Sequence, residues 1–264
     1  KEGNNDVIQV FCEFWRKNGS SSPKLLSAAK EGRGQLVQGL LIAGAEVDTR
    51  NEKGETGLDL AIMGGHSEVA EMFLDHGISG YNREESLEEC DKNRQRNMKL
   101  ISAAEHGDND SVTRLLEEGA EITSKDYYGD TGIHLAAGKD HHLVVNTFLE
   151  KGIDVNIRGD GQWTAVINAA YSGHLTSLKL LLDAGGDPDL KTKSGYTALI
   201  LAAINNYPEI VMALIKKGPA DINAEVRISQ TTLSWATSQN RIDFVKLLLE
   251  KKGIRAGVKD INHY

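Results

Sequence analysis

Apolar and small residues recur along this chain in a fixed order: an aliphatic residue, two variable positions, and then a pair that begins with alanine. The pattern occurs seven times. Its leading residues are Leu25, Leu58, Leu100, Ile133, Val166, Leu199 and Leu233. Subtracting successive numbers gives intervals of 33, 42, 33, 33, 33 and 34 residues. A period held this closely predicts a repeat protein in which each copy is one supersecondary unit.

Each copy then contains a residue that favours a left-handed turn. Three positions after the small pair, only Gly, Asn or Asp occurs: Gly32, Gly65, Gly107, Asp140, Gly173, Asn206 and Asn240. These residues tolerate positive φ, so the first helix of each copy is predicted to end there. Apolar pairs four to five and eight to nine positions further on predict the buried stripe of a second helix, which a later glycine ends.

A threonine two residues before the leading aliphatic residue predicts where each first helix begins. The threonines at this position are Thr56, Thr131, Thr164, Thr197 and Thr231. Their hydroxyls can accept hydrogen bonds from the free amides of the first helical turn, which is the role of an N-cap. In the first copy, Ser22 and Pro23 supply a cap and a first-turn proline instead.

Together these features resemble the ankyrin repeat. The segments GDTGIHLAAGKDHHLVVNTFLEKGIDVN and GYTALILAAINNYPEIVMALIKKG are similar to its pattern G-x-T-P-L-H-x-A-A-x-x-G-H followed by L-L-x-x-G-A-x-x-N. The resemblance extends from Ser22 to about Ala256. It implies an all-α solenoid of seven helix-turn-helix repeats joined by β-turn fingers. In every copy that has the threonine, another residue stands in place of the proline of T-P-L-H, and the histidine remains only at His134. These departures predict weaker helix starts and an unchanged architecture.

The chain is predicted to divide into five parts. These are an N-terminal capping helix within residues 1–21, repeats 1 and 2 in 22–78, an inserted segment in 79–97, repeats 3–7 in 98–256, and the start of a tail or further repeat in 257–264. A capping helix is expected because the terminal unit of a solenoid faces water on one side. The inserted segment lacks a G-x-T turn, and its charged residues predict that the first helix of repeat 3 extends back toward Arg83.

Composition narrows the function classes. The chain has 264 residues, of which 40% are hydrophobic and 26% charged, as is typical of a folded protein with a core. The net charge of −8 disfavours binding to the phosphates of nucleic acid, and no apolar run is long enough to span a membrane. Cys12 and Cys90 are far apart, which predicts no disulfide framework and a reducing compartment. We therefore expect a cytoplasmic protein with no nucleic acid partner and no membrane insertion.

Reactive side chains do not converge in the sequence. His66, His141 and His174 each follow the left-handed turn, where the ankyrin family commonly has a structural histidine. The adjacent pair His141 and His142 has poor spacing for metal ligands, and the GGDPD segment at Gly185 follows a helix, so it is no phosphate loop. We expect no enzymatic activity, no cofactor and no metal.

The fingers and the exposed edges of the first helices form the predicted binding groove, since ankyrin-like stacks use these positions for partners. Aromatic residues gather there in repeats 4–6, and aromatic side chains dominate interface hot spots. The candidate partner-binding residues are Tyr127, Tyr128, Asp130, Trp163, Tyr171, Lys193, Tyr196, Ile204 and Asn205. The alternative for Tyr127 or Trp163 is that the ring packs on an adjoining finger.

We expect a scaffold that holds a partner protein or peptide with apolar anchors and basic residues in this groove. The alternative is that the repeats recruit substrates for a larger enzyme, such as a ubiquitin ligase subunit or a secreted bacterial effector. A purely structural spacer would not require clustered aromatic residues. The family resemblance further implies that Asn156, which follows Leu149 and Asp154, is a possible target of asparaginyl hydroxylation.

Overall fold

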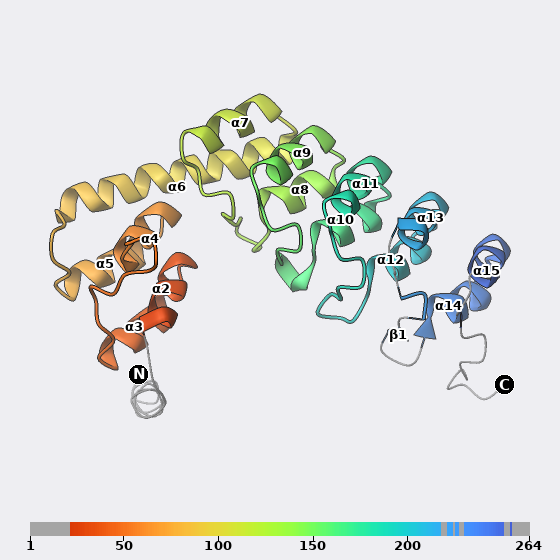
Figure 1. Cartoon of the computed structure of the whole chain (residues 1–264), viewed down its shortest axis with the longest axis horizontal. Helices are drawn as coiled ribbons and strands as arrows, with labels where there is room; N and C mark the ends of the chain where they lie inside the picture. Colours follow the sequence, from red (N-terminus) through yellow and green to blue (C-terminus); the bar gives the residue numbers. More distant parts are fainter. Residues whose placement is uncertain (1–21, 218–220, 224, 227–229, 251–253, 255–264) are drawn as a thin grey trace. The chain divides into compact units, whose positions relative to one another are not determined.

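The computed structural model describes residues 22–217, 221–223, 225–226, 230–250 and 254. Nearly all of the secondary structure in these ranges is helical, and short helices follow one another in pairs at the predicted period (Figure 1). The all-α repeat architecture is therefore confirmed for the described part of the chain. The predicted capping helix in residues 1–21 and the tail in residues 257–264 lie outside the described residues.

The chain forms two compact units, and the boundary between them falls inside one helix. In the described part of the chain, the first unit contains residues 22–99 and 117–121. Its helices are α2 (Ser22–Lys30), α3 (Gly34–Ile42), α4 (Gly57–Gly64), α5 (Ser67–Asp75) and most of α6 (Arg83–His106). Helix α2 packs on α4 and α3 packs on α5. Leu25, Leu58 and Phe73 are fully buried in the core of this unit.

The second unit contains residues 100–116 and the described residues from 122 onward. Its helices after α6 are α7 (Asn109–Glu117), α8 (Gly132–Gly138), α9 (His142–Glu150), α10 (Ala165–Ser172), α11 (Leu175–Asp183), α12 (Ala198–Ile204), α13 (Pro208–Lys217), α14 (Thr232–Ser238) and α15 (Ile242–Leu249). The first helices pack on one another in the order α8, α10, α12 and α14, and the second helices do so in the order α9, α11 and α13. Ala136, Ala169 and Ala202 are fully buried, and their small side chains allow the first helices to approach closely.

Tight turns form the fingers between repeats. Isolated β-bridges join Arg50 to Thr56 and Lys125 to Thr131 at the base of two fingers. In the last finger, β1 (Glu225–Val226) pairs antiparallel with β2 (Gln230–Thr231). The fifth repeat instead has a short 3-10 turn, η1 (Asp160–Gln162).

The predicted helix ends agree with the structure. All seven turn residues have positive φ, between 53° and 82°. The side chains of Thr56, Thr164, Thr197 and Thr231 accept hydrogen bonds from the amides three residues later, as N-caps do. Thr131 is likewise the N-cap of its helix and forms a capping box with His134, whose Nδ1 accepts from the Thr131 amide at 3.2 Å and lies 2.8 Å from the Thr131 hydroxyl.

The inserted segment is helical. Helix α6 begins at Arg83, the residue toward which the first helix of repeat 3 is expected to extend. Asn93 donates from Nδ2 to the carbonyl of Ile62 at 3.0 Å. Asn97 donates to the carbonyls of Met63 and Gly64, both at 3.3 Å, so the two asparagines satisfy free carbonyls at the end of α4. No helix among the described residues is long and apolar enough to cross a membrane.

Candidate functional site

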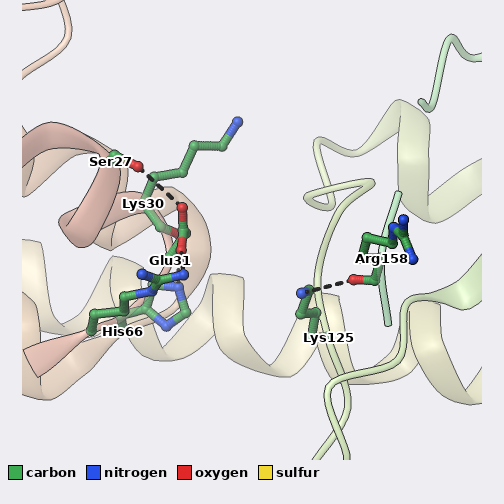
Figure 2. Close-up of polar contacts among 7 residues, drawn as sticks. Ser27, Lys30, Glu31, His66, Lys125 and Arg158 are labelled. Atoms are coloured by element: carbon green, nitrogen blue, oxygen red, sulfur yellow. Dashed lines mark hydrogen bonds and ion pairs between the residues drawn. The ribbon is translucent and has the colours of Figure 1, made fainter. Parts of the chain in front are cut away.

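Three consecutive fingers in the second unit, those of repeats 4, 5 and 6, are joined by hydrogen bonds. Lys125 Nζ donates to the carbonyl of Arg158 at 3.2 Å, which Figure 2 shows. Arg158 Nη1 in turn donates to the carbonyl of Lys191 at 2.7 Å, and the amide of Lys193 donates to the carbonyl of Gly161 at 2.6 Å. The middle finger is therefore held from both sides.

A buried histidine fixes the base of the middle finger. Nδ1 of His134 accepts from the amide of Thr131 at 3.2 Å and lies 2.8 Å from its hydroxyl. Nε2 lies 3.1 Å from the carbonyls of Ile157 and Trp163. Because these carbonyls can only accept, the proton sits on Nε2 and the ring is neutral. Burial lowers the pKa of His134, which favours this neutral form.

Repeats 4 and 5 each contain a pair of aromatic rings in contact. The rings of Trp163 and Tyr171 are perpendicular, with centroids 5.2 Å apart, and those of Tyr127 and Tyr128 are perpendicular at 5.5 Å. Edge-to-face pairs of this kind fix the orientation of both rings. The structure thus joins the finger residue Trp163 to Tyr171 of α10.

Exposure separates the candidate residues into two groups. Tyr127 and Tyr128 are 96% and 72% exposed and Tyr171 is 47% exposed, whereas Trp163 is half-buried. A side chain as exposed as that of Tyr127 does not pack on a neighbouring finger, so the packing alternative is wrong for this residue. Trp163 does pack, but on a helix of its own repeat.

The remaining candidates lie in repeat 6. Lys193 is exposed at the finger, and Tyr196 is half-buried and donates its amide to Thr192 Oγ1 at 3.1 Å. Ile204 is exposed on α12. Asn205 donates from Nδ2 to the carbonyl of Tyr171 at 2.7 Å. Asn205 therefore connects repeat 6 to the aromatic pair of repeat 5.

Carboxylates hold and flank the fingers. Asp126 Oδ1 accepts from the amides of Tyr128 and Asp130, and Asp130 Oδ1 accepts from the amide of Asp160 at 3.0 Å. The side chain of Asp160 is exposed beside Trp163 in sequence. These negative charges favour a cationic side chain on a bound partner.

One feature of the middle finger was missed by the sequence reasoning. Gln162 has φ of 63°, at the position where the neighbouring fingers have Gly129 and Gly195. The sequence does indicate an unusual turn, because Gly161 stands one residue before the position that Gly129 and Gly195 occupy in their fingers. A side chain other than glycine in this conformation costs about 1 to 2 kcal/mol.

Asn156 is half-buried and engaged by the next repeat. Its Oδ1 accepts from the amide of Asp187 at 2.8 Å, and its Nδ2 donates to the carbonyl of Gly185 at 3.5 Å. The side chain would have to leave these partners to enter the active site of a hydroxylase. Hydroxylation at Asn156 remains a prediction.

The histidines that follow the left-handed turns bind backbone. Nε2 of His66, His141 and His174 lies 3.0 to 3.1 Å from carbonyls of Lys30, Glu105 and Gly138 in the preceding repeat; Figure 2 shows the first of these bonds. Their structural role is thus confirmed. In the described part of the chain, no group of three or more His, Cys, Asp or Glu side chains is placed to hold a metal ion.

The chain belongs to the ankyrin-repeat family. A family model of ankyrin repeats matches it in three copies, at residues 25–126, 100–192 and 167–260. Ankyrin repeats generally serve as protein-interaction modules, and the family is typically non-enzymatic.

Several proteins are similar to parts of the chain. The E3 ubiquitin-protein ligase KEG of Arabidopsis thaliana is 35% identical over 109 residues, which cover 41% of this chain and 6% of the ligase. An L-asparaginase of Dirofilaria immitis is 25% identical over 178 residues, which cover 54% of this chain and 30% of that protein. A protein of Rickettsia felis named as an ankyrin repeat protein is 38% identical over 64 residues, 24% of this chain and 83% of its own length. The chain thus spans under a third of the two longer relatives.

Proposed function

We propose that this chain binds an extended segment of a partner protein on the fingers and first helices of repeats 4–6. The observation that carries this proposal is the arrangement of aromatic side chains there: Tyr127 and Tyr128 are exposed to water, and Trp163 and Tyr171 are held edge to face. Rigid aromatic side chains provide large contact area and lose little conformational entropy on binding. Tyr127 and Tyr128 do not contribute to the core, because their side chains are 96% and 72% exposed.

The partner segment should carry apolar anchors and Lys or Arg residues. The aromatic rings offer apolar faces, and Asp130 and Asp160 lie at the neighbouring fingers. Lys125 and Arg158 already donate to finger carbonyls, so part of the local positive charge is committed to the scaffold. The net charge of −8 adds a long-range attraction for a basic segment.

Selection of peptides from a random library on the wild-type protein would test this proposal. The selected peptides should combine aromatic or aliphatic residues with Lys or Arg, and should lose binding to a Tyr127→Ala, Tyr128→Ala protein. These two side chains are so exposed that their removal should leave the melting temperature unchanged. A Glu52→Ala variant, which changes an exposed finger residue in the first unit, is the matched control. Acidic peptides, or peptides indifferent to the tyrosines, would refute the proposal.

A second candidate function is recruitment of substrates to a larger enzyme. The similarity to an ankyrin-containing stretch of a ubiquitin ligase supports it. In that case the catalytic machinery lies outside these residues, and the same groove binds the substrate. Incubation of the natural full-length protein with ubiquitin, activating and conjugating enzymes and ATP would test it; transfer of ubiquitin to a fused selected peptide, abolished by the tyrosine variant, is the expected result. If no ubiquitin is transferred, the recruitment proposal fails and only the scaffold function remains proposed.

We also propose a cytoplasmic location. Cys90 carries a free, buried thiol, and burial raises its pKa, so the reactive thiolate is disfavoured. A structural thiol of this kind suits a reducing compartment. A fluorescent fusion of the natural protein should therefore be found in the cytoplasm, and secretion of the fusion would contradict this assignment.

A further inference from the structure

The finger of repeat 5, residues 158–163, has an unfavourable backbone conformation at its tip. Gly161 and Gln162 are both left-handed, with φ of 54° and 63°. Left-handed backbone is unfavourable for Gln because its Cβ approaches the following carbonyl oxygen. Such a conformation persists only where surrounding contacts over-determine it.

Arg158 is the principal support of this turn. Its Nη1 donates to the carbonyl of Gln162 at 2.8 Å and to the carbonyl of Lys191 at 2.7 Å. One guanidinium nitrogen thus fixes the strained residue and ties it to the next finger. The amide of Lys193, which donates to Gly161, and Asp130 Oδ1, which accepts from Asp160, hold the rest of the tip.

The turn determines where the Trp163 ring lies. A Cβ atom at Gly161 would be 3.3 Å from Trp163 Cδ1, so the tip of the finger lies directly against the indole. The amide of Trp163 donates to the carbonyl of Asp160 at 2.9 Å. If Gln162 returned to a right-handed conformation, the chain direction entering Trp163 would change and the ring would leave Tyr171.

We infer that Arg158 is a positioning residue, which holds the strained turn at Gln162 and thereby keeps Trp163 against Tyr171 before any partner arrives. The inference rests on the proposed function, because Trp163 is part of the proposed binding surface. Arg158 need not touch the partner. Its effect on binding depends on residue 162: with glycine at that position the turn is unstrained, and the guanidinium is no longer needed to hold it.

The test uses a Trp15→Phe, Trp235→Phe background, in which Trp163 is the single tryptophan of the chain. Arg158→Gln should shift Trp163 fluorescence to the red and increase its quenching by acrylamide, because the ring leaves Tyr171. Adding Gln162→Gly should restore the wild-type spectrum. Lys125→Gln is the matched control: Lys125 also donates to a finger carbonyl but does not touch the strained turn, so the spectrum should not change. Ser194→Gly, at the exposed tip of the finger of repeat 6, should fail to restore the wild-type spectrum of Trp163 in the Arg158→Gln protein.

Binding of a peptide selected on the wild type gives a second measurement. Arg158→Gln should weaken it roughly 5- to 30-fold, the range expected for the penalty of one left-handed residue, and Gln162→Gly should recover it. An unchanged Trp163 spectrum in Arg158→Gln, or a failure of Gln162→Gly to restore it, would overturn the positioning role even if peptides bind. Conversely, if the Trp163 spectrum changes in Arg158→Gln and is restored by Gln162→Gly but no peptide binds, the positioning role stands and the proposed function fails.

Discussion

Replacement of His134 by leucine should destabilise the second unit strongly. The ring is fully buried and its two nitrogens serve Thr131, Ile157 and Trp163. Leucine can make none of these bonds, and it removes this partner from the Thr131 amide and hydroxyl and from the Ile157 carbonyl, whereas the Trp163 carbonyl keeps its bond from the Gly159 amide. A buried polar group left unpaired costs about 1 to 3 kcal/mol. Because two sides of the ring are affected, we expect a loss of about 3 to 4 kcal/mol in the free energy of unfolding.

The same residue should make stability depend on pH. Burial lowers the folded-state pKa of His134 below the ordinary histidine value of 6.5. Between the lowered pKa and 6.5, the unfolded chain binds a proton that the folded protein does not. Stability contributed by the neutral ring is therefore complete above pH 6.5 and is lost as pH falls through this window, by up to about 1.4 kcal/mol per pH unit.

Urea unfolding followed by circular dichroism, at pH values from 7.5 to 5, would measure both effects. The wild type should lose stability below pH 6.5 more steeply than His134→Leu. His174→Leu is the matched control, because His174 is half-buried in the same unit and binds only one carbonyl, that of Gly138; it should cost about 1 kcal/mol. Equal pH slopes for the wild type and His134→Leu, or equal costs for the two variants, would refute the account of His134.

Three further predictions follow from the repeats. Asn206 has φ of 63°, so Asn206→Gly should be neutral or stabilising and Asn206→Val should cost about 1 to 2 kcal/mol in thermal unfolding; equal melting of all three proteins would contradict this. Asn97→Ala should cost about 2 to 3 kcal/mol in the first unit, because Asn97 bonds Met63, Gly64 and the amide of Glu121, whereas exposed Gln95→Ala should cost nothing. Asn156 should gain 16 Da by mass spectrometry with an active asparaginyl hydroxylase, with Asn146 as the unmodified control; an unchanged Asn156 peptide would remove the idea.

The regular part of the fold was predictable because it depends on local chemistry. Gly, Asn and Asp tolerate positive φ, so their recurrence at one position of the repeat predicted the left-handed turns at Asp140 and Asn206. The start of α6 near Arg83 was also predictable, because helix-forming charged residues replaced the turn chemistry of a finger. These inferences required no knowledge of which residues meet in space.

The details of the site depend on contacts distant in sequence. Local preference argues against a left-handed Gln162, and only the bonds from Arg158 and the next finger explain it. Position in the repeat identified Trp163 and Tyr171 as candidates, but their edge-to-face contact joins a finger to a helix and needs side-chain geometry. His134 shows the same limit: the position of Thr131 predicted the helix cap, but not that the buried ring of His134 would also bond the distant carbonyls of Ile157 and Trp163.

The central claim is that the fingers and first helices of repeats 4–6 bind a basic peptide segment with apolar anchors. Isothermal titration of a peptide selected on the wild type tests it most directly, with wild type, Tyr127→Ala, Trp163→Ala and Glu52→Ala measured in parallel. Tyr127→Ala and Trp163→Ala should each weaken binding by about 2 kcal/mol, roughly thirtyfold. Tyr127→Ala should also retain the wild-type melting temperature, and Glu52→Ala should bind as the wild type does. Wild-type affinity in both aromatic variants would contradict the claim.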